Sequence, residues 1–188
     1  MKLNAQPLSV QLPNLNKLSK RFIIEVISSD NLKNIFNDYK PNFNKEGIEE
    51  IFNRTYELCF NPAADINFTN VLHLCYDLEE EKYCAILNIG TTTAVDDIVS
   101  INVEFLFVEP EYRGEIFEEL ADTKLSEYLL LDYVVGTIGQ YSKKNLGIGW
   151  VELTPVNDKI REIYTSYGFQ KINSSGKHEL EDWMVFNI

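Results

Sequence analysis

The chain alternates between two kinds of apolar pattern, and their order constrains its fold more than any single residue does. Short runs of β-branched and aromatic residues predict strands, and apolar residues three or four apart predict helices. The expected strands are 22–27, 71–78, 83–92, 98–108, 150–153, 169–172 and 183–188. The expected helices are 30–39, 48–59, 123–145 and 157–167. The order β, α, α, β, β, β, α, β, α, β, β predicts an α/β (α+β) domain with a sheet and packed helices.

The length fits a single domain. A chain of 188 residues with 45% apolar content can bury a substantial core. We expect a polar leader over residues 1–21 and one domain over 22–188. The leader contains Pro7 and Pro13 and lacks the apolar segment of a signal peptide. No run elsewhere has the length of a membrane span, so we expect a cytoplasmic protein with no membrane partner.

Charge and cysteine usage narrow the classes of partner. The formal net charge is −12. Such a chain repels phosphate backbones and anionic lipid, so we expect no nucleic-acid partner. The three cysteines, Cys59, Cys75 and Cys84, lack the spacing of a metal site or a redox pair and are interpreted as reduced core thiols. With only two histidines and no ligand cluster, we expect no bound metal.

Two segments carry a more specific signal. The strand 98–108 ends in the run Val108-Glu109-Pro110-Glu111-Tyr112-Arg113-Gly114, and the helix that starts at Asn157 is closed by Tyr167-Gly168-Phe169. In this order the two segments resemble motifs of the GNAT superfamily, the acetyl-CoA-dependent N-acyltransferases. The element order over about residues 22–188 resembles the same family. The resemblance implies a central mixed, mostly antiparallel twisted sheet flanked by helices, with acetyl-CoA as acyl donor.

The chain departs from the family pattern directly after Gly114. The family continues with two more small residues, whose backbone amides approach a pyrophosphate. Here Ile116 and Glu118 stand at the matching positions, and Glu115 and Glu119 add further negative charge. These carboxylates would repel an anion, and the connection to the next helix is longer than the family needs.

Two alternatives follow for this connection. In the first, 115–122 forms a separate short helix or flap, and the long helix begins near Thr123 or Ser126, either of which can act as its amino cap. The first amides of this helix would then meet the cofactor phosphate. In the second, the helix starts near Gly114, its glutamates face the positive end of the helix dipole, and no phosphate binds.

The resemblance assigns residues to cofactor binding. They are Phe107, Val108, Arg113, Gly114, Thr123, Ser126 and Asn157. Phe107 and Val108 would line the pantetheine arm, and Arg113 with Gly114 would hold the cofactor loop. Core packing is an alternative role for the first two residues, and capping of the following helix is one for Asn157.

Two residues are candidates for the chemistry. Glu104 interrupts an apolar strand, where the family often places a carboxylate that acts as general base, and partial burial would raise its pKa. A solvated or lysine-paired carboxylate is the alternative. Tyr164 lies four residues before Gly168, where the family pattern has its general-acid tyrosine. Tyr164 also falls on the apolar face of its helix, so a core role is the alternative.

The resemblance therefore implies an N-acyltransferase that moves an acetyl or other short acyl group from coenzyme A to a primary amine of a small molecule or protein. The alternative is a catalytically silent GNAT-fold module that binds a ligand or protein partner, and the carboxylates after Gly114 favour it. A nucleic-acid mimic that uses the negative surface is a third, weaker hypothesis.

Overall fold

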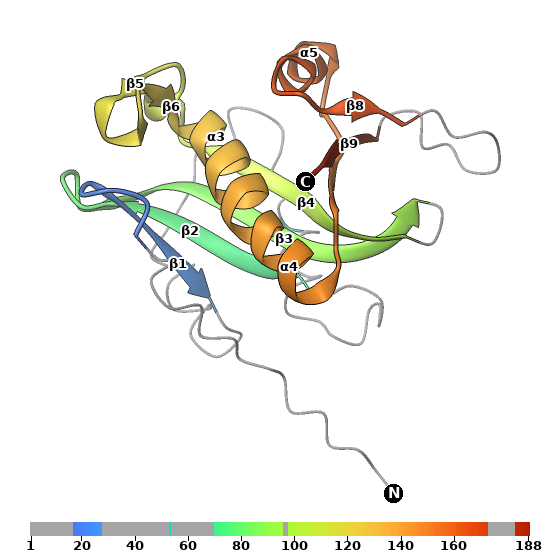
Figure 1. Ribbon diagram of the computed structural model, residues 1–188. Helices are drawn as coiled ribbons and strands as arrows, with labels where there is room; N and C mark the ends of the chain where they lie inside the picture. The colour runs from blue at the N-terminus through green and yellow to red at the C-terminus, as the bar shows by residue number, and fades with distance from the viewer. Residues whose placement is uncertain (1–16, 28–52, 54–69, 96–97, 173–182) are drawn as a thin grey trace, which may run out of the picture.

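Seven strands form one sheet in the order β1-β2-β3-β4-β7-β9-β8 (Figure 1). The computed structural model describes residues 17–27, 53, 70–95, 98–172 and 183–188. The strands are β1 Phe22–Ile27, β2 Val71–Asp77, β3 Lys82–Val95, β4 Ile98–Val108, β7 Trp150–Leu153, β8 Gln170–Lys171 and β9 Met184–Asn187. Neighbouring strands are antiparallel, except that β4 and β7 are parallel. The predicted α/β fold with a mixed, mostly antiparallel sheet is confirmed.

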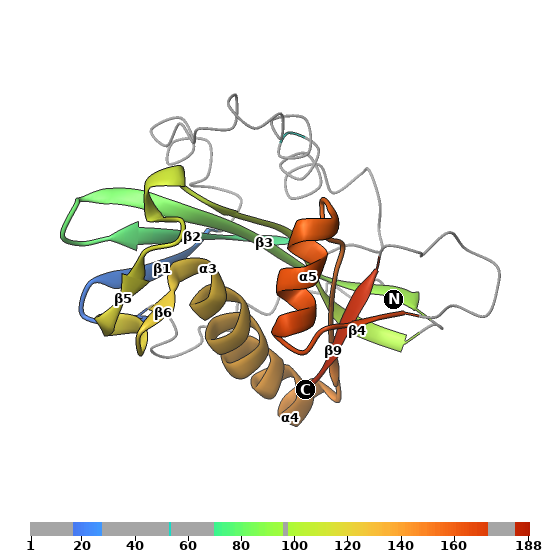
Figure 2. The same ribbon diagram turned by 90° about the horizontal axis from the view of Figure 1, so that it is seen from above.

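One long helix and one short helix lie on the same side of the sheet (Figures 1 and 2). The long helix is continuous through α3 (Leu125–Tyr128), η4 (Leu129–Gly139) and α4 (Gln140–Leu146), and the short helix is α5 (Asp158–Ser166). The segment η4 has π-helical hydrogen bonding. The long helix ends at Gly147, which takes the left-handed backbone conformation with φ 73°. Lys143 and Lys144 occupy the last turn, where cations favour the negative end of the helix.

The core lies between these helices and the sheet. Its fully buried members include Leu129 and Val134 of the long helix and Val151 of β7. Tyr164 and Tyr167 of α5 pack against the same cluster. Cys75 and Cys84 are both 0% exposed, so their predicted core role is confirmed.

Some predictions fall outside the described residues. The expected helices 30–39 and 48–59 and the thiol of Cys59 belong to this part of the chain. Within the described residues, none of the helices has both the length and the apolar character that crossing a membrane requires.

The connection after β4 folds as a small hairpin, which we call the insertion hairpin (116–124). It pairs β5 (Ile116–Phe117) with β6 (Thr123–Lys124), and a short 3₁₀ turn, η3 (Glu118–Leu120), joins the two strands. Phe117 and Leu120 are 3% and 0% exposed, so this segment is anchored in the core. The glutamates 115, 118 and 119 are exposed.

The hairpin decides between the two alternatives for this connection. Because the long helix begins at Leu125, the prediction that it starts near Gly114 is wrong. The expected side-chain caps are wrong as well. Lys124 holds the N-cap position without a side-chain hydrogen bond, and the Thr123 hydroxyl donates to the Leu120 carbonyl at 2.7 Å. The Thr123 hydroxyl therefore bonds within the hairpin and does not cap the helix, because Thr123 belongs to β6.

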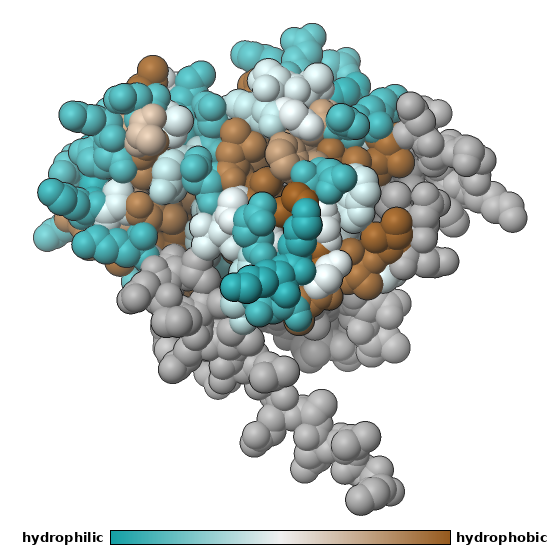
Figure 3. Space-filling view, viewed as in Figure 1, coloured by the Kyte–Doolittle hydropathy of each residue, from teal (hydrophilic) through white to brown (hydrophobic). Residues whose placement is uncertain are grey.

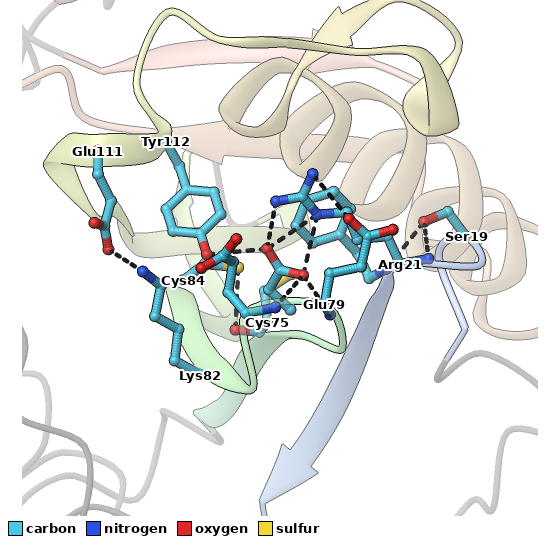
Figure 4. Close-up of polar contacts among 11 residues, drawn as sticks. Ser19, Arg21, Cys75, Glu79, Lys82, Cys84, Glu111 and Tyr112 are labelled. Atoms are coloured by element: carbon cyan, nitrogen blue, oxygen red, sulfur yellow. Dashed lines mark hydrogen bonds and ion pairs between the residues drawn. The ribbon is translucent and has the colours of Figure 1, made fainter.

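Asp77 organises the polar contacts of this region. Figure 4 shows three of its partners, Arg21, Glu79 and Tyr112. Its carboxylate is completely buried and accepts hydrogen bonds from the Arg21 guanidinium at 2.8–3.0 Å and from the Tyr112 hydroxyl at 3.0 Å. The Glu79 amide donates a further bond at 2.9 Å. Burial alone would raise the pKa of Asp77, but these hydrogen bonds together lower it below its usual value. We call Arg21, Asp77 and Tyr112 the Asp77 cluster.

Aromatic contacts extend the Asp77 cluster to the insertion hairpin. The Arg21 guanidinium carbon lies 5.3 Å from the centre of the Phe117 ring, and the Tyr112 and Phe117 rings are stacked at 6.2 Å. Phe22 meets Phe117 edge to face at 5.1 Å. Tyr112, part of the run that resembles a cofactor loop, therefore ties the loop to β1 and to the turn between β2 and β3.

Replacing Asp77 with Asn should destabilise the protein by about 3 kcal/mol, because it leaves the Arg21 charge without its buried partner. The loss is measured by urea unfolding at pH 7. Since the folded pKa of Asp77 is depressed, its contribution is present above the usual carboxyl pKa and is lost as pH falls through the folded value. The difference between wild type and variant should therefore shrink in acid.

The matched control is Glu79→Gln. Glu79 lies 3.4 Å from Arg21, but its side chain is 61% exposed, so the change should cost less than about 1 kcal/mol. Equal losses in both variants would contradict the role given to Asp77.

Candidate functional site

The parallel ladder between β4 and β7 is short, and its end defines the site. It contains the pairs Ile101↔Val151, Asn102↔Glu152 and Val103↔Leu153. The next residue, Glu104, is a bulge: Ile89 of β3 pairs with Val103 and Asn88 with Phe105, so Glu104 is skipped. A bulge bends and twists its strand. We call the point where β7 ends and β4 continues along β3 the strand fork.

The strand fork has two chemically different faces. Val103, Leu106 and Val108 contribute to the core on the side of the helices. Cross-strand partners project to the same face and neighbours along a strand to opposite faces. Asn102 and Glu152 therefore lie on the opposite face, away from the long helix. The predicted general base Glu104 therefore belongs to the strand fork, and the predicted general acid Tyr164 packs against the core on the helical side of the sheet.

Tyr164 is held on the helical side by α5. Asn157 caps this helix, because its side-chain oxygen accepts from the Ile160 amide at 2.9 Å. The tight end of the helix follows at Gly168, whose φ is 97°. Tyr164 packs on Phe169 with ring centres 6.0 Å apart. Burial, with a smaller contribution from Tyr167, raises the pKa of Tyr164 to about 12, so the phenol is neutral and can donate a proton or hydrogen bond at pH 7.

The helix α5 lies beside the start of the long helix (Figure 2). After burial, interaction with Glu127 of α3 is the next cause that raises the pKa of Tyr167. Apolar side chains gather at the surface between α3 and α5 (Figure 3). The partly buried members of the core on this side include Leu106, Tyr128 and Tyr164. This region combines an apolar lining with a phenol and the first turn of a helix.

Glu104 is half-buried on the bulge. Its carboxylate accepts a hydrogen bond from the Asn102 amide group at 2.9 Å. Asn102 is 3% exposed, so it holds Glu104 from a fixed position at the strand fork. The proposed role of Glu104 as general base stays a prediction.

Glu152 is a carboxylate that the sequence interpretation missed. It is completely buried in β7, and neither of its oxygens has a hydrogen bond of normal geometry among the described residues. Burial raises its pKa to about 7, against a smaller lowering by the Ser100 hydroxyl. The signal was the same as for Glu104: a carboxylate inside an apolar strand. The family pattern drew attention to β4 and not to β7.

The residues expected to contact a cofactor are only partly brought together. Arg113 turns back onto its own strand: its Nε donates to the Val108 carbonyl at 2.7 Å, and its guanidinium lies 4.9 Å from the centre of the Phe107 ring. The Arg113 side chain therefore contacts the last two residues of β4. Phe107 and Val108 are 2% and 5% exposed and project to opposite faces. Gly114 is exposed with φ 80°, a conformation that other residues rarely adopt.

The first turn of the long helix offers a group of donors. Ser126 is half-buried there, and Lys124 precedes it with an exposed side chain. The first amides of a helix have no partners within the helix, and no side chain caps them here. A phosphate group could bind these amides together with Lys124 and the Ser126 hydroxyl.

A separate hollow of about 230 Å³ lies beside β9. It is lined by Trp150, Gly168, Gln170, Val185, Phe186 and Asn187. Glu104, Glu152 and Tyr164 do not line it, although Val185 is the cross-strand partner of Glu152.

The sequence matches no protein-family model and no curated protein. Solved structures do share its fold. A tyrosine-to-phenylalanine mutant of the AtaT toxin, bound to the C-terminus of the antitoxin AtaR and to acetyl-CoA, is 14% identical, with a TM-score of 0.56 over 89% of this chain and 94% of that one. AtaT complexed with acetyl-methionyl-tRNAfMet is 14% identical, with a TM-score of 0.55 over 88% and 94%.

A third similar structure contains a GCN5-related glucosamine N-acetyltransferase region within a fungal multi-domain β-N-acetylglucosaminidase. It is 14% identical, with a TM-score of 0.50, and the match covers 81% of this chain and 17% of that one. At these identities the likeness establishes the GNAT-like fold.

The expectation that this kind of chain has no nucleic-acid partner is wrong. Proteins of the same fold occur in complexes with tRNA and with DNA, and others are bound to an antitoxin protein. The physical error lies in using net charge, which averages the whole surface. Contact with phosphates depends on where individual cations lie. The expected partner, a small-molecule or protein amine acceptor, was also too narrow, because solved structures of this fold contain tRNA, DNA or an antitoxin.

Glu152→Gln should stabilise the protein at pH 8. Because burial raises the folded pKa above the usual value of about 4.5, ionisation of Glu152 costs stability as pH rises from about 4.5 to 7. The amide cannot ionise, so the variant should be more stable than wild type by about 2 kcal/mol at pH 8 and nearly equal at pH 4. Urea unfolding at both pH values measures the difference.

Glu162→Gln is the control, since Glu162 is exposed on α5. It should change stability little at either pH. A Glu152→Gln variant that is no more stable than wild type at pH 8 would show that the buried carboxylate has a partner or is not ionised.

Proposed function

We propose that this chain is an N-acyltransferase that transfers an acetyl or other short acyl group from coenzyme A to a primary amine. The observation that carries the proposal is the strand fork, which has the carboxylates Glu104 and Glu152 on one face of the sheet, while the neutral phenol of Tyr164 packs against the core on the other face. A GNAT-like fold and the acetyl-CoA bound by AtaT support it. The acceptor amine can be free or carried by a larger molecule, as in the acetyl-methionyl-tRNA complex of AtaT.

The residues present fit the acyl donor in two respects. Beyond Val103, β4 continues to Val108 without pairing to β7, and an extended pantetheine arm would lie beside this part of the strand. The uncapped first turn at Leu125, with Lys124 and Ser126, suits a pyrophosphate. The exposed glutamates of the insertion hairpin oppose an anion, so the helix start rather than Gly114 would hold the phosphates.

Acetyl-CoA would supply an activated acyl group as a thioester. The amine nitrogen attacks the carbonyl carbon, the carbon–sulfur bond breaks, and the nitrogen loses a proton while the sulfur gains one. In this chain a carboxylate at the strand fork would accept the proton from nitrogen. Tyr164, which stays protonated at neutral pH, would donate to the departing sulfur.

The rival function is a silent module that binds a ligand or protein without catalysis. The insertion hairpin favours it, because it replaces the small residues of the family loop with a packed segment that carries exposed carboxylates. The antitoxin-bound toxin structures illustrate protein binding by the same fold. Acetyl-CoA binding separates the two functions.

Isothermal titration should detect binding of acetyl-CoA and of free coenzyme A. Lys124→Glu should weaken both by about tenfold, which corresponds to about 1.4 kcal/mol, because it reverses a charge beside the expected phosphate position. Lys171→Glu is the matched control, since Lys171 is exposed on β8 and should leave affinity unchanged. Absence of binding at high ligand concentration would reject the transferase function and favour the silent module.

Tyr164→Phe should keep acetyl-CoA affinity near that of wild type and lower turnover by about 100-fold, because only the proton donor is removed. Release of free thiol from acetyl-CoA, in the presence of a panel of primary amines, measures turnover. Tyr167→Phe removes a hydroxyl from the same helix and should retain most activity. Equal losses in the two variants would remove Tyr164 from the mechanism.

A further inference from the structure

We propose that the face of the strand fork opposite the long helix is a binding subsite for a protonated primary amine, with the Glu152 carboxylate as its ion partner and Glu104 beside it. The inference rests on the proposed function and deepens it by assigning the acceptor group to this face. The main electrostatic contact with the ammonium is then made by Glu152 of β7 and not by Glu104 of β4.

The backbone register places the groups of this subsite together. Glu152 is the cross-strand partner of Asn102, and adjacent strands lie about 4.8 Å apart. Asn102 holds the Glu104 carboxylate at 2.9 Å. Glu104 stands on the bulge one residue past the last ladder pair and is half-buried, so it is the more solvent-exposed of the two carboxylates.

Glu152 has unused capacity to bind a donor. Its side chain is completely buried, and both carboxylate oxygens lack a hydrogen-bond partner within the described part of the chain. Leaving such a group unpaired is costly, and a carboxylate accepts hydrogen bonds at both oxygens. An ammonium group carries three N–H donors and one positive charge, so it meets both requirements at once.

The surrounding side chains do not neutralise Glu152. On its face of the sheet, the neighbouring positions are Ser100, Asn102 and Glu104 on β4 and Val185 on β9. Glu104 is the one titratable group among these four. In the described residues, neither glutamate forms an ion pair with a lysine, arginine or histidine. Among the described positions on this face, Glu104 and Glu152 are therefore the charged groups, and two carboxylates suit a cation.

The same contact prepares the amine for attack. The ammonium would first bind ionised Glu152 and then transfer one proton to it, which leaves a neutral amine and a protonated carboxyl group. A carboxyl pKa of about 7 makes this transfer far less unfavourable than it would be for an ordinary exposed carboxylate. The nitrogen lone pair is then free to attack a carbonyl carbon held at the strand fork, and the Glu152 proton returns to solvent.

The test uses propylammonium chloride as the probe and tetramethylammonium chloride, which has the same charge but no N–H donor, as its counterpart. Binding to the full chain is measured by thermal shift and titration calorimetry at pH 6 and pH 8, at constant ionic strength. Ionised Glu152 rises from about one tenth to about nine tenths of the protein between these pH values. Wild-type affinity for propylammonium should therefore rise about tenfold, with little response to tetramethylammonium.

The variants assign the effect to one residue. Glu152→Gln should lose the pH dependence and bind propylammonium at least tenfold more weakly at pH 8, while exposed Glu162→Gln should match wild type. Glu104→Gln should weaken binding but keep the pH dependence. Wild-type affinity in Glu152→Gln, no binding to wild type, or equal binding of the two cations would overturn the proposal.

Titration of the same proteins with acetyl-CoA distinguishes failure of the ammonium subsite from failure of the proposed transferase function. Glu152→Gln should bind acetyl-CoA like wild type, because the carboxylate faces away from the expected phosphate position. If wild type binds propylammonium but not acetyl-CoA, the transferase function is rejected and the ammonium subsite is supported. If wild type binds acetyl-CoA but not propylammonium, only the ammonium subsite is rejected.

Discussion

The early end of the parallel ladder between β4 and β7 is the constraint on which the candidate site depends. Three residue pairs hold the two strands together, and the bulge at Glu104 then bends β4 away. A bulge displaces one residue from the regular hydrogen-bond pattern and increases local twist. The strand fork that results brings Glu104 and Glu152 near each other on one face and leaves the other face to the helices and Tyr164.

The Asp77 cluster stabilises the region next to the strand fork. Its buried carboxylate joins the chain before β1, the end of β2 and the loop after β4. Stacking of Tyr112 on Phe117 carries this support into the insertion hairpin. A segment that resembles a cofactor loop therefore has a structural role first. The proposed function therefore assigns the cofactor phosphates to the uncapped start of the long helix.

Much of the fold could be predicted because its signals are local. The limits of β4 and β7 agree with the sequence, and Asn157 caps α5 as its side chain suggests. The insertion hairpin was missed because its strands have two residues each, too few for a periodic pattern. The Thr123 cap was wrong because the hydroxyl bonds to Leu120, a contact that depends on the hairpin. Net charge was a poor guide to nucleic acid, because it carries no information on position.

The sequence by itself determined the order of elements, the cap of α5 and the position of Tyr164 relative to Gly168, since these depend on residues a few positions apart. Tertiary structure alone decided that Glu152 is buried opposite Asn102 and that Asp77 binds both Arg21 and Tyr112. These contacts join residues distant in the chain, and the low dielectric around them sets the pKa of each carboxylate. Opposite shifts in Asp77 and Glu152 follow from one difference: Asp77 is buried with a cation and several donors, and Glu152 is buried without a cation.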